Sequence, residues 1–350
     1  MIKSDITFVV QGPIIPDVTL SCLLSIRRNF PDSPIILSTW KGHDAAGLIY
    51  DDLVLSDDPG FFYYSDRAGE KQNNVNRQIA SSLAGLQRVK TEYVFKLRTD
   101  FSLSGSDFLS FWNAFSQVDP GYQVFHEKIL ACSYFTRNPA SKMPFPFHPS
   151  DIAFFGRTED LINFFDIPLM TEAEVYWDKK NSRFNRYVPE QHIFINCLRK
   201  NGKTVQCDHY NDNSEHNIIE TEKYFASNFV FLTFDQFNLV PLKSIFLMKP
   251  HPNSFRTCYT HNEWLALYKK HVDPLIILPT RDKEREKIEG FYRAYKKYRL
   301  LGNVAAGSEL LGTGGVELER ALGRVRGHGH LGGGLGLGQV RVGSFGQGSE

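Results

Sequence analysis

The hydrophobic and polar positions of residues 91–100 alternate, which predicts a β-strand with one apolar face and one charged face. Successive side chains of a strand point to opposite faces. One face holds Tyr93, Phe95, Leu97 and Thr99, and the other holds Val94, Lys96, Arg98 and Asp100. Two cations and a carboxylate at the end of a strand suit a phosphate group with a divalent metal. The alternative is an edge strand with a solvated face and an internal Arg98–Asp100 pair.

Strand-like and helical segments alternate along the first hundred residues. The strands are residues 5–11, 35–40, 52–56 and 91–100, and the helices are 18–30 and 73–88. In the second helix an apolar stripe recurs at helical spacing, with three polar side chains opposite it at Asn74, Arg77 and Ser81. This alternation favours an α/β fold with a mostly parallel, Rossmann-like sheet covered by helices.

The pattern loosens after Phe101. It predicts a helix over residues 107–115, strands over 123–126, 129–135 and 152–156, and a helix that begins at 158. Further segments read as mostly helical: 189–199, 218–229, 239–247, 260–270 and 281–300. From Gly302 to Glu350 the chain is dominated by Gly, Leu, Val and Arg. Because each glycine loses extra backbone entropy on folding, this part is predicted to be a disordered tail.

Polar or glycine-containing loops follow four of the predicted strands, at residues 11–13, 41–44, 57–60 and 98–100. Ligands of parallel sheets bind at the carboxyl ends of the strands. The four loops therefore predict a binding cleft at that edge. No G-x-G-x-x-G sequence follows the first strand and no Walker A sequence is present, so the cleft lacks the usual signatures of dinucleotide and P-loop sites.

Composition narrows the classes of partner and compartment. The chain has 350 residues and a net charge of +1, which gives no support to nucleic-acid binding. Its five cysteines are far apart, odd in number and without a C-x-x-C pair, which favours a reducing, cytoplasmic setting over a disulfide scaffold. The first residues run straight into a strand without a signal-peptide pattern, and no apolar run approaches the length of a membrane span.

Six short blocks occur in an order that resembles the WavE lipopolysaccharide-synthesis family, whose fold is related to the GT-A glycosyltransferases. The blocks are residues 9–14, 36–40, 73–78, 96–100, 148–151 and 189–191. The resemblance covers about residues 5–300 and leaves the tail outside. It implies one GT-A-like domain over residues 1–300, with a nucleotide-sugar half up to about 105, an acceptor half over 106–300, and the tail over 301–350.

The resemblance also implies a donor site. By position, the residues expected to bind the nucleotide-sugar are Gln11, Gly12, Asp57, Asp58, Asn74, Arg77, Lys96, Arg98 and Asp100. Asp100 is also expected to hold a divalent cation, Mn²⁺ or Mg²⁺. Arg98 stands where the first Asp of a D-x-D motif would be, so metal use is an open question and Arg98 and Lys96 are candidates to supply that charge. Simpler interpretations are a tight turn at Gly12, solvated loop carboxylates, and a solvent-facing Arg77.

An inverting transfer needs a base that takes the proton of the acceptor hydroxyl. The two candidates are Glu190 and Asp151, of which Glu190 is preferred. A glutamate in a first helical turn also stabilises the helix without any catalytic role. His148 and Gln191 are the expected acceptor contacts.

The implied function is a nucleotide-sugar-dependent, hexosyl-type glycosyltransferase that acts on a lipopolysaccharide or another surface glycan. The acceptor is expected to be lipid-linked, and the basic segment 281–300 is a candidate for peripheral contact with the inner face of the cell membrane. A solvated helix is the simpler interpretation of that segment. The alternative functions are a nucleotidyltransferase that makes an activated sugar and a non-catalytic glycan-assembly protein.

Overall fold

The computed structural model describes residues 5–66, 69–176, 185–242 and 255–305. The chain divides into two units, Met1–Arg293 and Ala294–Glu350. Most of the predicted tail, and the second half of the predicted segment 239–247, lie outside the described residues. The last described helix, α11 (Lys283–Ala305), extends past Leu300, where the tail was expected to begin.

A seven-stranded sheet forms the centre of the first unit, in the order β10-β8-β9-β6-β1-β2-β3. Only β9 runs antiparallel to its neighbours. The strands are β1 (Ile6–Gln11), β2 (Ile35–Trp40), β3 (Asp52–Ser56), β6 (Tyr93–Arg98), β8 (Ile129–Cys132), β9 (Ala153–Arg157) and β10 (Phe229–Leu232). Two smaller pairs are the hairpin β4 (Phe62–Asp66) with β5 (Gly69–Asn73), and β7 (Phe101–Leu103) with β11 (Leu239–Pro241).

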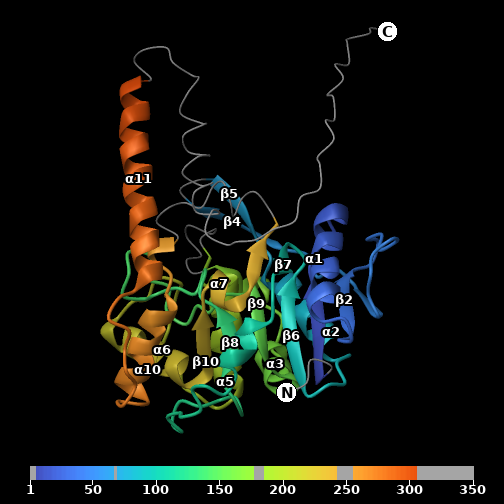
Figure 1. The fold of residues 1–350 in the computed structure, drawn as a ribbon, viewed down its shortest axis with the longest axis horizontal. Helices are drawn as coiled ribbons and strands as arrows, with labels where there is room; N and C mark the ends of the chain where they lie inside the picture. Colours follow the sequence, from blue (N-terminus) through green and yellow to red (C-terminus); the bar gives the residue numbers. More distant parts are fainter. Residues whose placement is uncertain (1–4, 67–68, 177–184, 243–254, 306–350) are drawn as a thin grey trace, which may run out of the picture. The chain divides into compact units, whose positions relative to one another are not determined.

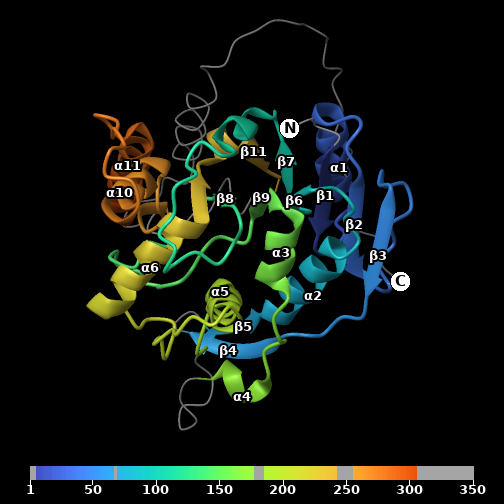
Figure 2. The same cartoon turned by 90° about the horizontal axis from the view of Figure 1, so that it is seen from below.

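Helices cover both faces of this sheet. Figure 2 shows α1 on one face and α2, α3 and α5 on the other. The helices are α1 (Pro16–Asn29), α2 (Val75–Leu86), α3 (Thr158–Phe165), α4 (Glu172–Val175), α5 (Pro189–Lys200), α6 (Glu215–Asn228), α7 (Phe234–Phe237), α10 (His261–His271) and α11, with a 3-10 turn η2 (Asp107–Phe111). The predicted α/β class, a mostly parallel sheet covered by helices, is confirmed (Figure 1), in keeping with the GT-A-like arrangement that the resemblance implies.

Helix α2 lies unusually close to the sheet because residue 85 is a glycine. A Cβ atom at Gly85 would lie 2.5 Å from Val9 Cγ1 and 3.0 Å from Ser38 Cβ, which is too close for any ordinary contact. The absence of a side chain therefore lets α2 pack directly on β1 and β2. Gly85 lies in the last turn of α2, so this packing fixes that end of the helix against the sheet.

Strand β6 is central, because β1 and β9 pair with its two sides, so the alternative of an edge strand does not hold. Three local predictions were wrong. Residues 107–115 form only the short turn η2, residues 123–126 are not a strand, and residues 239–241 form a strand rather than a helix. All five cysteines are buried free thiols. Among the described residues, no helix is long and apolar enough to cross a membrane.

Candidate functional site

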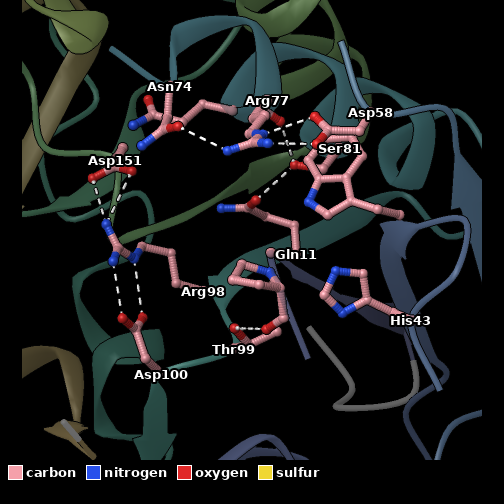
Figure 3. Close-up of a pocket in the computed structure, with 14 residues that line it drawn as sticks. Gln11, His43, Asp58, Asn74, Arg77, Ser81, Arg98, Thr99, Asp100 and Asp151 are labelled. Carbon is pink, nitrogen blue, oxygen red and sulfur yellow. Dashed lines mark hydrogen bonds and ion pairs between the residues drawn. The ribbon is translucent and has the colours of Figure 1, made fainter. Parts of the chain in front are cut away.

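A cavity of about 350 Å³ opens where β1, β2 and β6 end, beside the first turns of α2. Figure 3 shows that its walls come from the strand-end loops and from α2. Each of the four predicted loops contributes to it. The lining residues are Gln11, Gly12, Pro13, Trp40, His43, Asp58, Asn74, Arg77, Gln78, Ser81, Arg98, Thr99, Asp100 and Asp151.

The end of β1 is held by hydrogen bonds to its neighbours. Ser81 Oγ lies 2.8 Å from Gln11 Oε1, so the amide oxygen is used by α2 and the amide nitrogen points into the cavity (Figure 3). Thr99 Oγ1 donates to the Pro13 carbonyl at 3.0 Å. Gly12 has φ +127°, a conformation that side chains rarely adopt, which explains why a glycine begins this loop. The floor of the cavity is therefore pre-organised.

Arg77 forms one side of the cavity and is paired with Asp58. Its Nε and Nη2 donate to the two Asp58 oxygens at 2.7 and 2.5 Å, and Nη1 donates to Asn74 Oδ1 at 3.2 Å. The hydrogen bonds from Arg77 lower the pKa of Asp58. The guanidinium also lies over the Phe61 ring, 4.9 Å from its centroid. Arg77 is thus fixed at the start of α2, where the free helical N–H groups also favour anions.

Arg98 lies between two carboxylates on the other side. Its Nε and Nη2 donate to Asp100 at 3.0 and 2.9 Å, and Nη1 lies 3.3 Å from Asp151 Oδ2. Asp100 is 1% exposed and Asp151 is 5% exposed. Burial alone would lower the pKa of Arg98, but the two carboxylates raise it, so the guanidinium stays charged. The site therefore holds a permanent cation at the end of β6.

Lys96, expected at the donor site, does not line the cavity. Its side chain is fully buried, its Nζ donates to the Asp151 carbonyl at 2.5 Å, and it lies 5.6 and 5.4 Å from the Phe154 and Phe165 ring centroids. Burial lowers the pKa of Lys96 to about 8, although Asp151 opposes the shift. Through its hydrogen bond to the Asp151 carbonyl, Lys96 supports the segment that carries Asp151 without facing the cavity.

Glu190 lies in the first turn of α5, beside a small hollow that Asp151 also lines. Burial and the nearby Asp151 charge raise the pKa of Glu190 to about 7. His148 Nε2 is 3.5 Å from Glu190 Oε2, but burial lowers the pKa of His148 to about 3, so the imidazole is neutral and the contact is no ion pair. Asp151 therefore links the main cavity to a carboxylate that titrates near neutral pH.

Two other predicted residues lie away from the cavity. Asp57 is exposed and pairs with Lys41 at 2.9 Å. Gln191 is fully buried, and its amide donates to the carbonyls of Pro146 and Tyr210 at 2.7 and 3.1 Å. Through these bonds Gln191 ties the start of α5 to the segments that carry Pro146 and Tyr210, which is a structural role.

The sequence interpretation missed several residues that line the cavity. Trp40 is the last residue of β2, and His43 follows in the loop that was already expected to contribute. Ser81 lies one helical turn after Arg77 on the same side of α2. A search of each strand's last residue, and of positions i+4 from Arg77, would have found Trp40 and Ser81.

The carboxylates do not fit a divalent cation in this arrangement. Both oxygens of Asp100 already accept hydrogen bonds from Arg98, and Asp151 faces the same guanidinium. Within the described part of the chain, no group of three or more His, Cys, Asp or Glu side chains is placed to hold a metal ion. Hard cations need several oxygen ligands, and Arg98 occupies the position in which they would meet.

Comparison with curated protein sequences finds no match to the chain. Among solved structures, the chain is similar to the crystal structure of a Drosophila beta-1,4-galactosyltransferase 7 mutant in complex with manganese, UDP-Gal and xylobiose. The identity is 9% and the TM-score 0.28, over 60% of this chain and 68% of that one. A likeness at this level decides neither the substrate nor the chemistry of this chain.

A family model described as WavE lipopolysaccharide synthesis matches residues 6–301. The match includes β1, the whole of the central sheet and every residue that lines the cavity. It agrees with the resemblance first noted in six short blocks. The chain belongs to the WavE lipopolysaccharide synthesis family.

Proposed function

We propose that the protein is a glycosyltransferase that moves a hexosyl group from a nucleotide-sugar to a lipopolysaccharide or another lipid-linked surface glycan. The observation that carries the proposal is the cavity at the ends of β1, β2 and β6, which Arg77 and Arg98 enter from opposite sides. Guanidinium groups suit the oxygens of a diphosphate, and a helix start adds N–H donors. Membership of the WavE family supports the glycan as the acceptor class.

In this proposal the donor binds by its charge and its base. The diphosphate lies between Arg77 and Arg98, with the amide nitrogen of Gln11 as a further donor. His43 lies at the far side of the cavity from Arg98 (Figure 3). Trp40 also lines the cavity, and both side chains offer aromatic surface to the base. Asp58 and Asp100 hold the two guanidinium groups in place, so neither carboxylate needs a metal ion to be neutralised.

Glu190 is the proposed base. In an inverting transfer the acceptor oxygen forms the new bond to the anomeric carbon as the bond to the diphosphate breaks. The hydroxyl proton passes to Glu190, and the diphosphate leaves with its new charge beside Arg98. A pKa of about 7 suits this role, because a base works best near the operating pH. Asp151 is the weaker candidate, since its oxygens already face Arg98. His148, neutral and next to Glu190, is the proposed acceptor contact.

Contact with the membrane surface is also part of the proposal. The loop between α10 and α11 carries Leu275 and Ile277 at 84% and 91% exposure. Basic side chains flank it, in the last turn of α10 and at Arg281 and Lys283. Protruding aliphatic side chains between cations are typical of proteins that touch an anionic bilayer. We place this contact at the inner face of the cell membrane.

The test is a thermal-shift screen of the full chain against UDP, GDP, CMP and their sugars, with Mn²⁺ and with EDTA. A ligand at 100 times its dissociation constant stabilises a protein by about 2.7 kcal/mol. We expect one nucleotide class to raise the melting temperature, and Arg77→Ala to abolish the rise. The matched control is Arg88→Ala, an exposed arginine just past the other end of α2.

Three outcomes would count against the proposal. No shift with any nucleotide would remove the donor site and favour a non-catalytic assembly protein. Release of pyrophosphate from a nucleoside triphosphate would favour a nucleotidyltransferase. A shift that Arg77→Ala and Arg88→Ala change equally would place the nucleotide elsewhere.

A further inference from the structure

A second cavity of about 350 Å³ lies near the amino-terminal ends of two strands, whereas the proposed donor site lies at the carboxyl ends of others. It is lined by residues just before β8, by the second residues of β8 and β10, and by the segment that follows η2. Since β8 and β10 run parallel to β6, the starts of these two strands lie on the side of the sheet opposite to the carboxyl ends of β1 and β6. None of its lining residues belongs to the first cavity.

Lys128 supplies a hydrogen-bond donor to this second cavity. The residue is 8% exposed, and its Nζ donates to the carbonyls of Gln117 and Ser227 at 2.5 and 3.4 Å. Burial lowers the pKa of Lys128 to about 7. In its charged form the ammonium group has three donors, and the two carbonyls account for two of them. The third N–H suits an uncharged oxygen as well as an anion.

Glu127 supplies an acceptor. Its Oε1 lies 3.5 Å from Arg157 Nη1, but its Oε2 is buried and has no hydrogen-bond partner among the described residues. A buried carboxylate oxygen without a partner is unfavourable, so a rotation of the Glu127 side chain that turns Oε2 toward the cavity would gain a hydrogen bond from a ligand hydroxyl.

The remaining wall is apolar. Phe111, Phe115, Leu130 and Val230 contribute to it, and the side chains of Asn113 and Ser116 lie at its rim. A cavity with aromatic walls and a few converging polar groups is the common form of a small-molecule site. Here the polar lining residues are Asn113, Ser116, His126, Glu127 and Lys128, a mixture of hydrogen-bond donors and acceptors that fits a neutral ligand with several hydroxyl groups better than a nucleotide or another polyanion.

We propose that this second cavity is a carbohydrate-binding subsite, in which a sugar hydroxyl donates to Glu127 Oε2, a sugar oxygen accepts from Lys128 Nζ, and the ring packs on Phe111 and Phe115. The subsite is separate from the proposed donor site. It would let the protein hold a glycan at two places, whichever reaction the first cavity performs.

The experiment is saturation-transfer NMR on the full chain, which detects weak binding. The probes are galactose, glucose, N-acetylglucosamine and delipidated lipopolysaccharide core oligosaccharide. Ser116→Trp is the main variant, because residue 116 is exposed at the rim and the indole fills the cavity without removing core packing. Glu127→Gln replaces one acceptor oxygen by an amide that donates. Arg77→Ala is the control in the first cavity.

We expect at least one probe to show saturation transfer that Ser116→Trp abolishes, that Glu127→Gln weakens about tenfold, and that Arg77→Ala leaves unchanged. A melting curve checks that each variant is folded. Lack of transfer to any probe would overturn the proposal. So would transfer that Arg77→Ala removes and Ser116→Trp does not, because the sugar would then bind in the first cavity. Nucleotide binding in the thermal-shift screen is independent of both results.

Discussion

Arg98 binds Asp100 through two parallel hydrogen bonds, Nε to Oδ1 at 3.0 Å and Nη2 to Oδ2 at 2.9 Å. The two residues are separated by one position, and together they close the carboxyl end of β6. Asp100 is almost completely buried, so its charge depends on this partner. The geometry needs a planar guanidinium, because only a fork of donors reaches both oxygens at once.

Replacing Arg98 by lysine should therefore cost stability even though the charge is kept. A lysine ammonium cannot make the two parallel bonds, and Asp100 would lose one of them in a buried setting. We expect Arg98→Lys to lower the free energy of unfolding by about 1–3 kcal/mol. Urea denaturation measures the change. Arg88→Lys, at an exposed ion pair, should stay within about 0.5 kcal/mol, and an equal loss in both variants would contradict the explanation.

Glu190 should make stability fall as the pH rises. Its pKa in the folded protein is about 7, above the ordinary 4.5, because burial and Asp151 disfavour the charge. Between these values the unfolded chain loses its proton first, so unfolding becomes easier with rising pH. Above about pH 7 the destabilisation caused by the Glu190 charge no longer changes with pH. Glu190→Gln should remove this destabilisation, so the free energy of unfolding of the variant relative to the original protein should be on the order of 1–3 kcal/mol higher at pH 8 than at pH 4.5.

The measurement is the difference in unfolding free energy between Glu190→Gln and the original protein at several pH values. The same variant should lose about 10²–10⁴-fold of any transfer activity, since a glutamine cannot take a proton. A stability difference that does not change between pH 4.5 and 8 would show that Glu190 has an ordinary pKa. Glu159→Gln, at an exposed side chain in the first turn of α3, is the control.

The parts of the fold that were predictable are those with a strong local pattern. The first three strands were placed within one residue of the observed bounds, because each is a short apolar run between turn residues. The convergence of four loops followed from the geometry of parallel strands alone. Periodicity does not reveal direction, however. The apolar run of β9 is the same whether the strand runs parallel or antiparallel, and its reversal was missed.

Side-chain roles were harder to predict, because they depend on residues far away in the sequence. Lys96 was expected to face a ligand, but Phe154 and Phe165 enclose it from segments more than 50 positions away. Gln191 was expected to meet the acceptor, yet the carbonyls of Pro146 and Tyr210 take both of its amide hydrogens. A polar residue near a predicted site has the same sequence signal whether it binds a ligand or a neighbouring loop.

Gly85 and Gly290 should respond in opposite ways to alanine. A Cβ at Gly85 meets Val9 at 2.5 Å, whereas at Gly290 the nearest atom is the mobile end of Arg293 at 3.9 Å. Gly85→Ala should push α2 off the sheet, cost about 1–3 kcal/mol and weaken nucleotide binding, because α2 carries Arg77. Gly290→Ala should stabilise α11 by about 0.5–1 kcal/mol. Melting temperatures with and without nucleotide test both, and equal effects would contradict the close approach.

The loop between α10 and α11 should be needed for membrane contact but not for folding. Leu275 and Ile277 are almost fully exposed, so the double change Leu275→Glu and Ile277→Glu removes little packing and should leave the melting temperature unchanged. Each buried aliphatic side chain contributes roughly 1.5–3 kcal/mol when it leaves water. The double variant should therefore bind phosphatidylcholine vesicles that contain phosphatidylglycerol at least tenfold more weakly, as measured by co-sedimentation. Leu55→Glu, on strand β3, is the control for added negative charge. If the loop variant and the control bind vesicles equally well, the loop does not contact the membrane.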